Sequence, residues 1–227
     1  MAKKVAAGAN RVVIDIPVGD TMKIRHFQDA EVIGKKFLML AKKFDMKMTI
    51  DVNLTLQPAG FGIGPNLEAR DVLSVLEQKK NRPMILEKKS LRLAGKLLNL
   101  CFPKQNGEKN AQELLSTGKA LTKMREIIKA QGGDDAVLSE EIKVGREKYE
   151  ILSHKKGEVN SVNNKNIAIV SRVLGSPDDK RAGIFLSERV SDKIDKNDIL
   201  MMLYSSDKWR LKEAKETLKQ FPIFKIS

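Results

Sequence analysis

The sequence has almost none of the side chains that build soft metal centres or disulfide frameworks. Among its 227 residues there is one cysteine, Cys101, and there are two histidines, His26 and His154. A single cysteine excludes an intramolecular disulfide and any zinc site made of several cysteines. The two histidines are far apart in the chain, so we expect ordinary core or surface positions for them and for Cys101.

Aromatic residues and long apolar runs are also scarce. Aromatics amount to 5% of the residues, which leaves few rings on which the bases of single-stranded nucleic acid could stack. No apolar run approaches the ~20 residues that a membrane-spanning helix needs, and no signal-peptide core follows the basic N-terminus. We therefore expect no membrane partner and take the cytoplasm as the default location.

Positive charge, by contrast, is abundant. The chain carries 42 lysines and arginines against 29 acidic residues, a formal net charge of +13. Such an excess favours anionic partners such as phosphates, nucleic acids or acidic membrane surfaces. Four lysine pairs, at 35–36, 42–43, 79–80 and 88–89, fall mostly on the outer faces of expected helices and are mixed with acidic residues. Charges in this pattern are typical of solvated surface, so we do not expect nucleic acid as the partner.

The first part of the chain has the pattern of an α/β fold. Hydrophobic residues make up 41% of the chain, enough for one or two globular domains. Arg11–Val18 is a nearly continuous apolar run, typical of a strand buried on both faces. Phe27–Phe44 has helical apolar spacing, and Met46–Val52 alternates as a strand does. This order predicts a βαβ unit and a sheet that is at least partly parallel.

A glycine-rich loop follows at Gln57–Pro65 and leads into a helix that we expect to begin near Pro65. Such a turn can aim backbone N–H groups at a phosphate. Its G-x-G-x-G spacing matches neither the dinucleotide-binding nor the Walker pattern, so spacing alone favours a plain tight turn. Further helices are expected at Met84–Cys101 and Ala111–Ala130.

The pattern changes after Gly133, and from about Lys148 the expected segments are short strands, with helices near Asn166–Leu174 and Asp207–Gln220. Ser206 is the expected N-cap of the last helix. We divide the chain into a part with an α/β sheet and helices, residues 1–140, and a β-rich C-terminal domain, residues 141–227. The predicted fold class is α/β (α+β): a partly parallel mixed sheet with flanking helices, followed by a small β-rich domain.

Four motifs together carry a family resemblance. They are VVIDIPVG at Val12–Gly19, QPAGFGIGPNLEARDVLSVL at Gln57–Leu76, SLRLAGKLL at Ser90–Leu98 and STGKALTKMREIIKAQGGD at Ser116–Asp134. In this order they resemble the C-terminal half of the thymidine/pyrimidine nucleoside phosphorylase family, which includes the archaeal-type AMP phosphorylases. The segment Leu174–Leu200 stands where that family has its C-terminal domain, so the likeness covers essentially the whole chain.

The resemblance implies reversible phosphorolysis, in which inorganic phosphate attacks the anomeric carbon of a nucleoside and releases the free base and a (deoxy)ribose 1-phosphate. Enzymes of this family are pentosyltransferases that position phosphate and stabilise charge on the departing base. They require no cofactor and are generally dimers or larger assemblies. The expected partners are therefore a nucleoside or nucleoside monophosphate, inorganic phosphate and, in a homodimer, a second copy of the chain.

The resemblance also implies that a separate N-terminal half carries the groups that hold phosphate. The base-contacting arginine and serine and the family's glycine-rich phosphate signature would lie upstream of Met1. We therefore expect this chain to be one portion of a longer or split enzyme, with no catalytic residue of its own and no activity in isolation. A non-catalytic binding or assembly module with a basic surface is the alternative.

Lys3 is the base-binding residue that the resemblance places within the chain. The segment Ala2–Gly8 is similar to the end of the family helix that carries a base-binding lysine, and Lys3 matches that lysine. Its ammonium group would donate a hydrogen bond to a carbonyl of the base. A solvated surface charge is the alternative for this residue.

The glycine-rich loop is similar to a cation site of some bacterial family members. Ala59 and Gly62 match positions whose backbone carbonyls bind the cation, and Asp71 matches the acidic ligand. Oxygen ligands of this kind suit a hard cation, here a monovalent one such as K⁺. The chain departs from the family just before the loop, where Asn53-Leu54 replaces the usual Thr-Asp.

Pro17 bears on the class of substrate. Bacterial pyrimidine-specific members usually have lysine at this position, whereas the AMP-phosphorylase-like branch has Ile-Pro, as Ile16-Pro17 does here. That branch is therefore the nearer one. The substrate itself is open between a pyrimidine nucleoside such as thymidine and a nucleoside monophosphate such as AMP.

Overall fold

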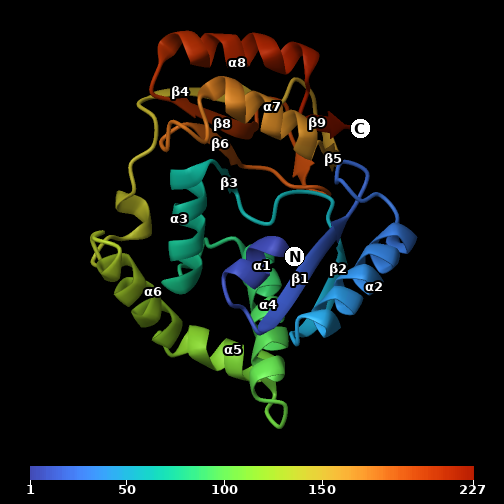
Figure 1. The fold of residues 1–227 in the computed structure, drawn as a ribbon. Helices are drawn as coiled ribbons and strands as arrows, with labels where there is room; N and C mark the ends of the chain where they lie inside the picture. Colours follow the sequence, from blue (N-terminus) through green and yellow to red (C-terminus); the bar gives the residue numbers. More distant parts are fainter. The chain divides into compact units, whose positions relative to one another are not determined.

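The computed structural model describes residues 1–227, which form two compact units. The first unit consists of residues 1–55 and 87–120, and the second of residues 56–86 and 121–227. Figure 1 labels most of the helices and strands of both units. None of the helices has the length and apolar character needed to cross a membrane.

The first unit is built around two parallel strands. β1 (Arg11–Val18) pairs along its whole length with β2 (Lys47–Leu54). The connection between them is α2 (Phe27–Lys43), so the predicted βαβ unit is confirmed. The unit also contains α1 (Ala2–Ala6), most of α4 (Met84–Cys101) and α5 (Gly107–Ser116).

One face of β1 is buried and the other is not. Val12, Ile14, Ile16 and Val18 form the core of the first unit together with residues of α2. The apolar run predicts burial on both faces, and that prediction is wrong, because Asp15 on the opposite face is only half-buried. The reason is electrostatic: that face of the sheet carries carboxylates, and they pair with cations of α4.

The segment 111–130 contains a break where its pattern predicts one continuous helix. α5 ends at Ser116, and a new helix, α6 (Lys119–Ala130), follows. Gly118 between them has φ of +74°, the left-handed conformation that ends helices. The Thr117 hydroxyl reinforces the break by donating to the Glu113 carbonyl at 2.7 Å.

The second unit combines α3 (Pro65–Leu76) with two antiparallel sheets. Its strands are β3 (Gly62–Ile63), β4 (Glu147–Leu152), β5 (Gly157–Val162), β6 (Gly183–Leu186), β7 (Lys193–Ile194), β8 (Ile199–Ser205) and β9 (Phe224–Ile226). One sheet has the order β3-β6-β8-β4 and the other the order β7-β5-β9. The short strands expected after residue 148 are thus confirmed.

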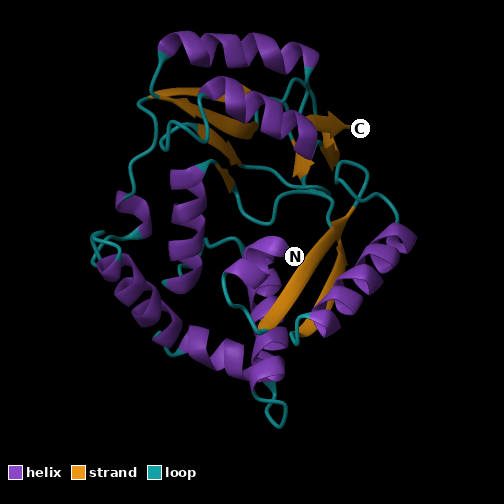
Figure 2. Cartoon of the chain, viewed as in Figure 1, coloured by secondary structure: helices purple, strands orange, loops and turns teal.

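Helices cover the strands of the second unit. α7 (Asn164–Leu174) and α8 (Lys208–Gln220) lie side by side over them (Figures 1 and 2). Leu174, Ile184 and Leu203 are fully buried between the two layers. A short 3₁₀ helix, η1 (Ser139–Glu141), precedes the first long strand of this unit. The core of the second unit therefore lies between α7, α8 and the β6–β8 pair.

The N-cap of α8 differs by one residue from the prediction. Asp207, not Ser206, is the cap, and its Oδ1 accepts from the Arg210 N–H at 2.9 Å. Both residue types are good caps, so the sequence pattern does not separate two neighbouring candidates.

The predicted α/β (α+β) class is confirmed, with one refinement. The parallel strands and the antiparallel strands lie in separate sheets instead of one mixed sheet. The compact units also divide the chain differently from the expected boundary, because β3 pairs with β6 and thereby places the glycine-rich loop and α3 in the second unit. The division into residues 1–140 and 141–227 stays a prediction about sequence domains.

Candidate functional site

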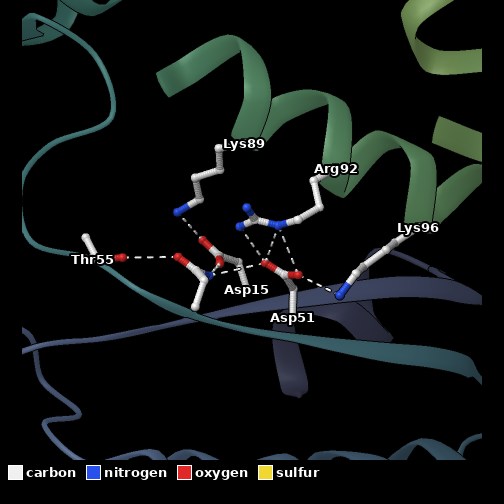
Figure 3. Close-up of polar contacts among 7 residues, drawn as sticks. Asp15, Asp51, Thr55, Lys89, Arg92 and Lys96 are labelled. Atoms are coloured by element: carbon white, nitrogen blue, oxygen red, sulfur yellow. Dashed lines mark hydrogen bonds and ion pairs between the residues drawn. The ribbon is translucent and has the colours of Figure 1, made fainter. Parts of the chain in front are cut away.

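A polar cluster lies between the β1–β2 sheet and α4 in the first unit (Figure 3). Asp15 and Asp51 occupy paired positions of the two parallel strands, and both face α4. The α4 side chains that meet them are Lys89, Arg92 and Lys96, whose spacing of three and four residues puts them on one face of the helix. These residues and two polar neighbours on β2 and just after it form a sheet–helix cluster, which consists of Asp15, Asp51, Asn53, Thr55, Lys89, Arg92 and Lys96.

Asp51 is the centre of the sheet–helix cluster. Its side chain is 4% exposed and accepts hydrogen bonds from two cations of α4. Arg92 donates from Nη2 to Oδ2 at 2.9 Å and from Nε to both carboxylate oxygens at 3.2 Å. Lys96 Nζ donates to Oδ1 at 2.6 Å. Charge-assisted bonds of this kind are the strong ones, and they require an ionised carboxylate.

The pKa of Asp51 follows from a competition between two effects. Burial by itself raises the pKa of the carboxyl group, but the hydrogen bonds and positive charges of Arg92 and Lys96 outweigh it. The net result is a pKa below the ordinary value for aspartate. Asp51 therefore carries its negative charge throughout the neutral and mildly acidic range.

Asn53 connects the two carboxylates. Its Nδ2 donates to Asp15 Oδ1 at 2.5 Å and to Asp51 Oδ2 at 3.2 Å, and its Oδ1 accepts from the Thr55 hydroxyl at 3.1 Å. Lys89 Nζ pairs with Asp15 Oδ2 at 2.6 Å. The amide thus bridges two like charges that neighbouring strands bring together, and Lys89 neutralises one of them.

The position of the cluster is compatible with ligand binding. It extends from the middle of the sheet towards the carboxyl end of β2, and ligands of open parallel sheets bind beyond the carboxyl ends of the strands. Its three cations exceed its two carboxylates by one charge, and the Arg92 and Lys96 side chains are 40% and 35% exposed. Chemically, this arrangement can orient an anionic group at the edge of the sheet.

The sequence pattern alone gives little indication of this cluster. One signal is present: Asp15 and Asp51 each place a carboxylate within an expected strand. Only the register of the parallel pair shows that the two acids are neighbours. Register depends on the fold, so the proximity of the two acids can be recognised only when the pairing of the strands is known.

A groove of about 410 Å³ adjoins the cluster at Asp15. Val13, Leu93 and Leu97 are among its apolar lining residues, and Lys4 adds a positive charge. Pockets of this size accommodate small molecules when they combine apolar walls with a few polar groups. The groove is therefore a second feature of the first unit with the chemistry of a binding site.

Lys3 lies on α1 and is exposed. It is not part of the groove, which its neighbour Lys4 lines instead. The other predicted site residues, Ala59, Gly62 and Asp71, belong to the second unit. The assignment of Lys3 as a base-binding residue stays a prediction.

The glycine-rich loop of the second unit closes around Asp71 of α3. Asp71 is buried, and its Oδ2 accepts from the Gly62 N–H at 2.8 Å. A side chain at Gly60 would collide with the Asp71 carboxylate, and a Cβ at Gly62 would lie 2.6 Å from the backbone of Leu67. The glycines of the loop therefore allow close backbone approach to a buried carboxylate.

Arg189 reaches the same loop from the segment between β6 and β7. Its Nη1 donates to the Gly60 carbonyl at 2.6 Å, and its Nη2 donates to the carbonyls of Pro58 at 2.6 Å and Ala59 at 3.3 Å. The guanidinium also lies 5.3 Å from the centre of the Phe61 ring, within cation–π range. Sequence patterns do not single out Arg189, since it follows Pro58 by 131 residues and the segment Leu174–Leu200 that contains it carries no expectation for this residue.

Burial perturbs both charged groups at the loop. It raises the pKa of Asp71, although the backbone N–H groups of Gly62 and Phe61 and the charge of Arg189 act in the opposite direction. It also lowers the pKa of Arg189, against the opposing effect of the Asp71 and Asp192 carboxylates. A guanidinium nevertheless stays protonated in proteins, so Arg189 brings a permanent positive charge to the loop.

The structure brings the three residues predicted to bind a cation, Ala59, Gly62 and Asp71, into one region, and the ligand groups of Ala59 and Asp71 already have partners. The Ala59 carbonyl accepts from Arg189, and the Asp71 carboxylate accepts from Gly62. No group of three or more His, Cys, Asp or Glu side chains that could hold a metal ion is present. The loop therefore fits a positive charge, and in this structure a side chain provides it.

Comparison with known proteins connects these features to a family. The family model for the pyrimidine nucleoside phosphorylase C-terminal domain matches residues 158–222. The chain is 38% identical over 216 residues to AMP phosphorylase 1 of Archaeoglobus fulgidus and 40% identical over 216 residues to AMP phosphorylase of Methanocaldococcus jannaschii. It is 36% identical over 222 residues to AMP phosphorylase of Methanosarcina barkeri.

These alignments cover 94–97% of this chain but 43–44% of each relative. The chain thus spans less than half the length of the curated relatives that it matches. The resemblance inferred from the four motifs is confirmed: over nearly its whole length the chain is similar to the C-terminal part of AMP phosphorylases, and residues 158–222 match the C-terminal domain of pyrimidine nucleoside phosphorylases.

Proposed function

We propose that this chain is the C-terminal portion of an enzyme that catalyses the reversible phosphorolysis of a nucleoside monophosphate. An oxygen of inorganic phosphate bonds to the anomeric carbon while the bond from that carbon to the base nitrogen breaks. The bonding electrons leave with the base, which takes up a proton, and the sugar 5-phosphate becomes a 1,5-bisphosphate. The supporting observation is the 36–40% identity over 94–97% of the chain to proteins named AMP phosphorylase.

AMP is the proposed substrate, with thymidine as the second candidate. The names of the relatives favour AMP, and Ile16-Pro17 has the pattern of that branch of the family. Thymidine is retained because the family model that matches residues 158–222 is named for pyrimidine nucleoside phosphorylases. We further propose that the complete enzyme is a cytoplasmic homodimer, as the family resemblance implies.

Lys3 has the proposed role of hydrogen-bonding the base. It is exposed on α1, so its ammonium group is accessible to a ligand. A hydrogen bond that involves a charged group contributes about 1.5–3 kcal/mol, which corresponds to roughly 10–100-fold in kcat/KM if it forms in the transition state. Lys3 is therefore the residue of this chain whose substitution tests the function most directly.

The test uses a chimera in which this chain replaces the matching 216 residues of the Methanocaldococcus jannaschii enzyme. Release of base from AMP, thymidine and uridine is measured by chromatography with and without inorganic phosphate. We expect phosphate-dependent release of adenine by the chimera and no release by the 227-residue chain alone. Preferential release of thymine would instead establish the second candidate.

Lys3→Ala in the chimera provides the residue-level test. We expect kcat/KM for AMP to fall by about 10–100-fold, because the base loses a charged hydrogen-bond donor. Lys36→Ala is the matched control, since Lys36 is an exposed lysine on α2, and it should leave kcat/KM unchanged. Equal activities of the two variants would show that Lys3 does not bind the base.

A further inference from the structure

A guanidinium group lies against the first part of the glycine-rich loop. Arg189 donates to three consecutive backbone carbonyls, those of Pro58, Ala59 and Gly60, at 2.6, 3.3 and 2.6 Å. Consecutive carbonyls that point at one positive centre are the kind of oxygen cage that binds a hard cation. Here the positive centre is a side chain of the same unit.

We propose that Arg189 acts as a built-in cation that holds the glycine-rich loop in place of a bound monovalent metal ion. The inference concerns the loop itself and goes beyond the proposed function, on which it does not depend. It differs from the expectation that Ala59, Gly62 and Asp71 bind K⁺, because Arg189 already provides the positive charge at the Ala59 carbonyl.

The charge balance of the loop supports this proposal. Asp71 is buried beneath the loop and attracts Arg189 electrostatically, as the half-buried Asp192 also does, so the guanidinium already compensates the buried negative charge of Asp71. A metal ion added beside Arg189 would place a second positive charge in the same low-dielectric region without a second buried carboxylate. The loop can therefore hold either the Arg189 guanidinium or a metal ion, but not both.

The surroundings of Arg189 hold its guanidinium in position. The Arg189 backbone N–H donates to Asp192 Oδ2 at 2.6 Å, and the ring of Phe61 lies 5.3 Å from the guanidinium. The next residue is fixed as well, since the Val190 N–H donates to Gln57 Oε1 at 2.8 Å. The contacts of Arg189 and Val190 with the loop thus all fall on its first part, residues 57–61, and a planar guanidinium fixed in this way loses little entropy for each hydrogen bond that it forms.

Thermal unfolding of the full chain in different salts tests the proposal. At equal ionic strength, we expect wild-type Tm to be the same in potassium, sodium and choline chloride, because no metal site is left to fill. Arg189→Ala should lower Tm by roughly 4–8 °C in choline. Potassium, or guanidinium at low millimolar concentration, should recover part of that loss by entering the vacated position.

Arg181→Ala is the matched control, since Arg181 is an exposed arginine of the same unit whose loss should leave Tm and its salt dependence unchanged. A wild-type Tm that rises specifically in potassium would overturn the proposal. So would an Arg189→Ala variant that responds to neither potassium nor guanidinium, because the vacated position would then not be a cation site.

Two further variants test whether the positive charge of Arg189 stabilises the loop, even if Arg189→Ala does not fold. Arg189→Lys keeps the positive charge, whereas Arg189→Gln has similar length without it. A Tm for the Lys variant well above that of the Gln variant supports a role for the charge. Equal Tm values for the two variants contradict it.

Discussion

At the scale of single residues, the sheet–helix cluster depends most on Asp51, whose 4% exposed carboxylate collects hydrogen bonds from Arg92, Lys96 and Asn53. Replacing Asp51 with Asn keeps the shape of the side chain but leaves two cations without their shared counter-charge. Removing one partner of a fully buried pair costs about 3–5 kcal/mol. Since Arg92 and Lys96 are partly solvated, we expect a smaller loss of unfolding free energy at pH 7, about 2 kcal/mol.

The pH dependence of this loss has a definite sign. The pKa of Asp51 is lower in the folded protein than its ordinary value of 3.8, so the stabilisation is fully present above that value and disappears as pH falls through the folded-state pKa. Urea unfolding of wild type and Asp51→Asn should therefore show equal differences at pH 7 and pH 5 and a shrinking difference below pH 3.8. A difference that persists undiminished at pH 2 would show that shape, not charge, is what matters at this position. Asp20→Asn, at an exposed aspartate, is the control.

At the scale of elements, the N-cap residue of α8 differs between the sequence-based prediction and the structure. Asp207 caps the helix through the Arg210 N–H, whereas Ser206 is exposed and lies before the cap. Loss of a cap costs about 1 kcal/mol, so Asp207→Ala should reduce the unfolding free energy by that amount. Ser206→Ala should change it by less than about 0.5 kcal/mol, as surface substitutions do. Chemical denaturation of the two variants side by side measures the difference, and a larger effect at Ser206 would reassign the cap.

The elements that the sequence pattern predicts well are those defined by local periodicity. Met84–Cys101 has the same bounds in the structure as in the prediction, and the helix after the glycine-rich loop begins at Pro65, because proline is favoured in a first helical turn. The break at Gly118 is harder to predict, since a single glycine is also tolerated within helices. Local patterns therefore give the extent of most elements but not every interruption.

The candidate sites are less predictable because they depend on contacts between distant segments. Arg189 meets Pro58 across 131 residues of sequence, and Asp15 meets Asn53 across 38. The three residues assigned to the glycine-rich loop do lie close together, and the assignment of a monovalent metal ion to them stays a prediction. The motif does not reveal that Arg189 meets this loop, because the two segments are distant in sequence and approach each other where β3 pairs with β6.

At the scale of the whole molecule, the net charge of +13 is distributed in two ways. Most lysines of the four pairs are exposed, including Lys35, Lys36, Lys42 and Lys43 on α2. Lys79 and Lys89, in contrast, form ion pairs with acids of their own units. The excess is thus largely solvated surface charge, which attracts polyanions without selecting among them.

This distribution predicts weak and unspecific binding to nucleic acid. For a duplex of about 20 base pairs, we expect fluorescence anisotropy to give a Kd weaker than about 10 µM at 150 mM salt and steeply tighter binding at low salt, because counterion release dominates. Lys35→Glu combined with Lys36→Glu should weaken the low-salt binding, since both side chains are exposed. A Kd below about 100 nM at 150 mM salt would exceed what phosphate contacts alone provide at that ionic strength. That result would favour the binding-module alternative over the phosphorylase. Weak, salt-sensitive binding would instead agree with the phosphorylase proposal, in which the anionic partners are phosphate and a nucleotide.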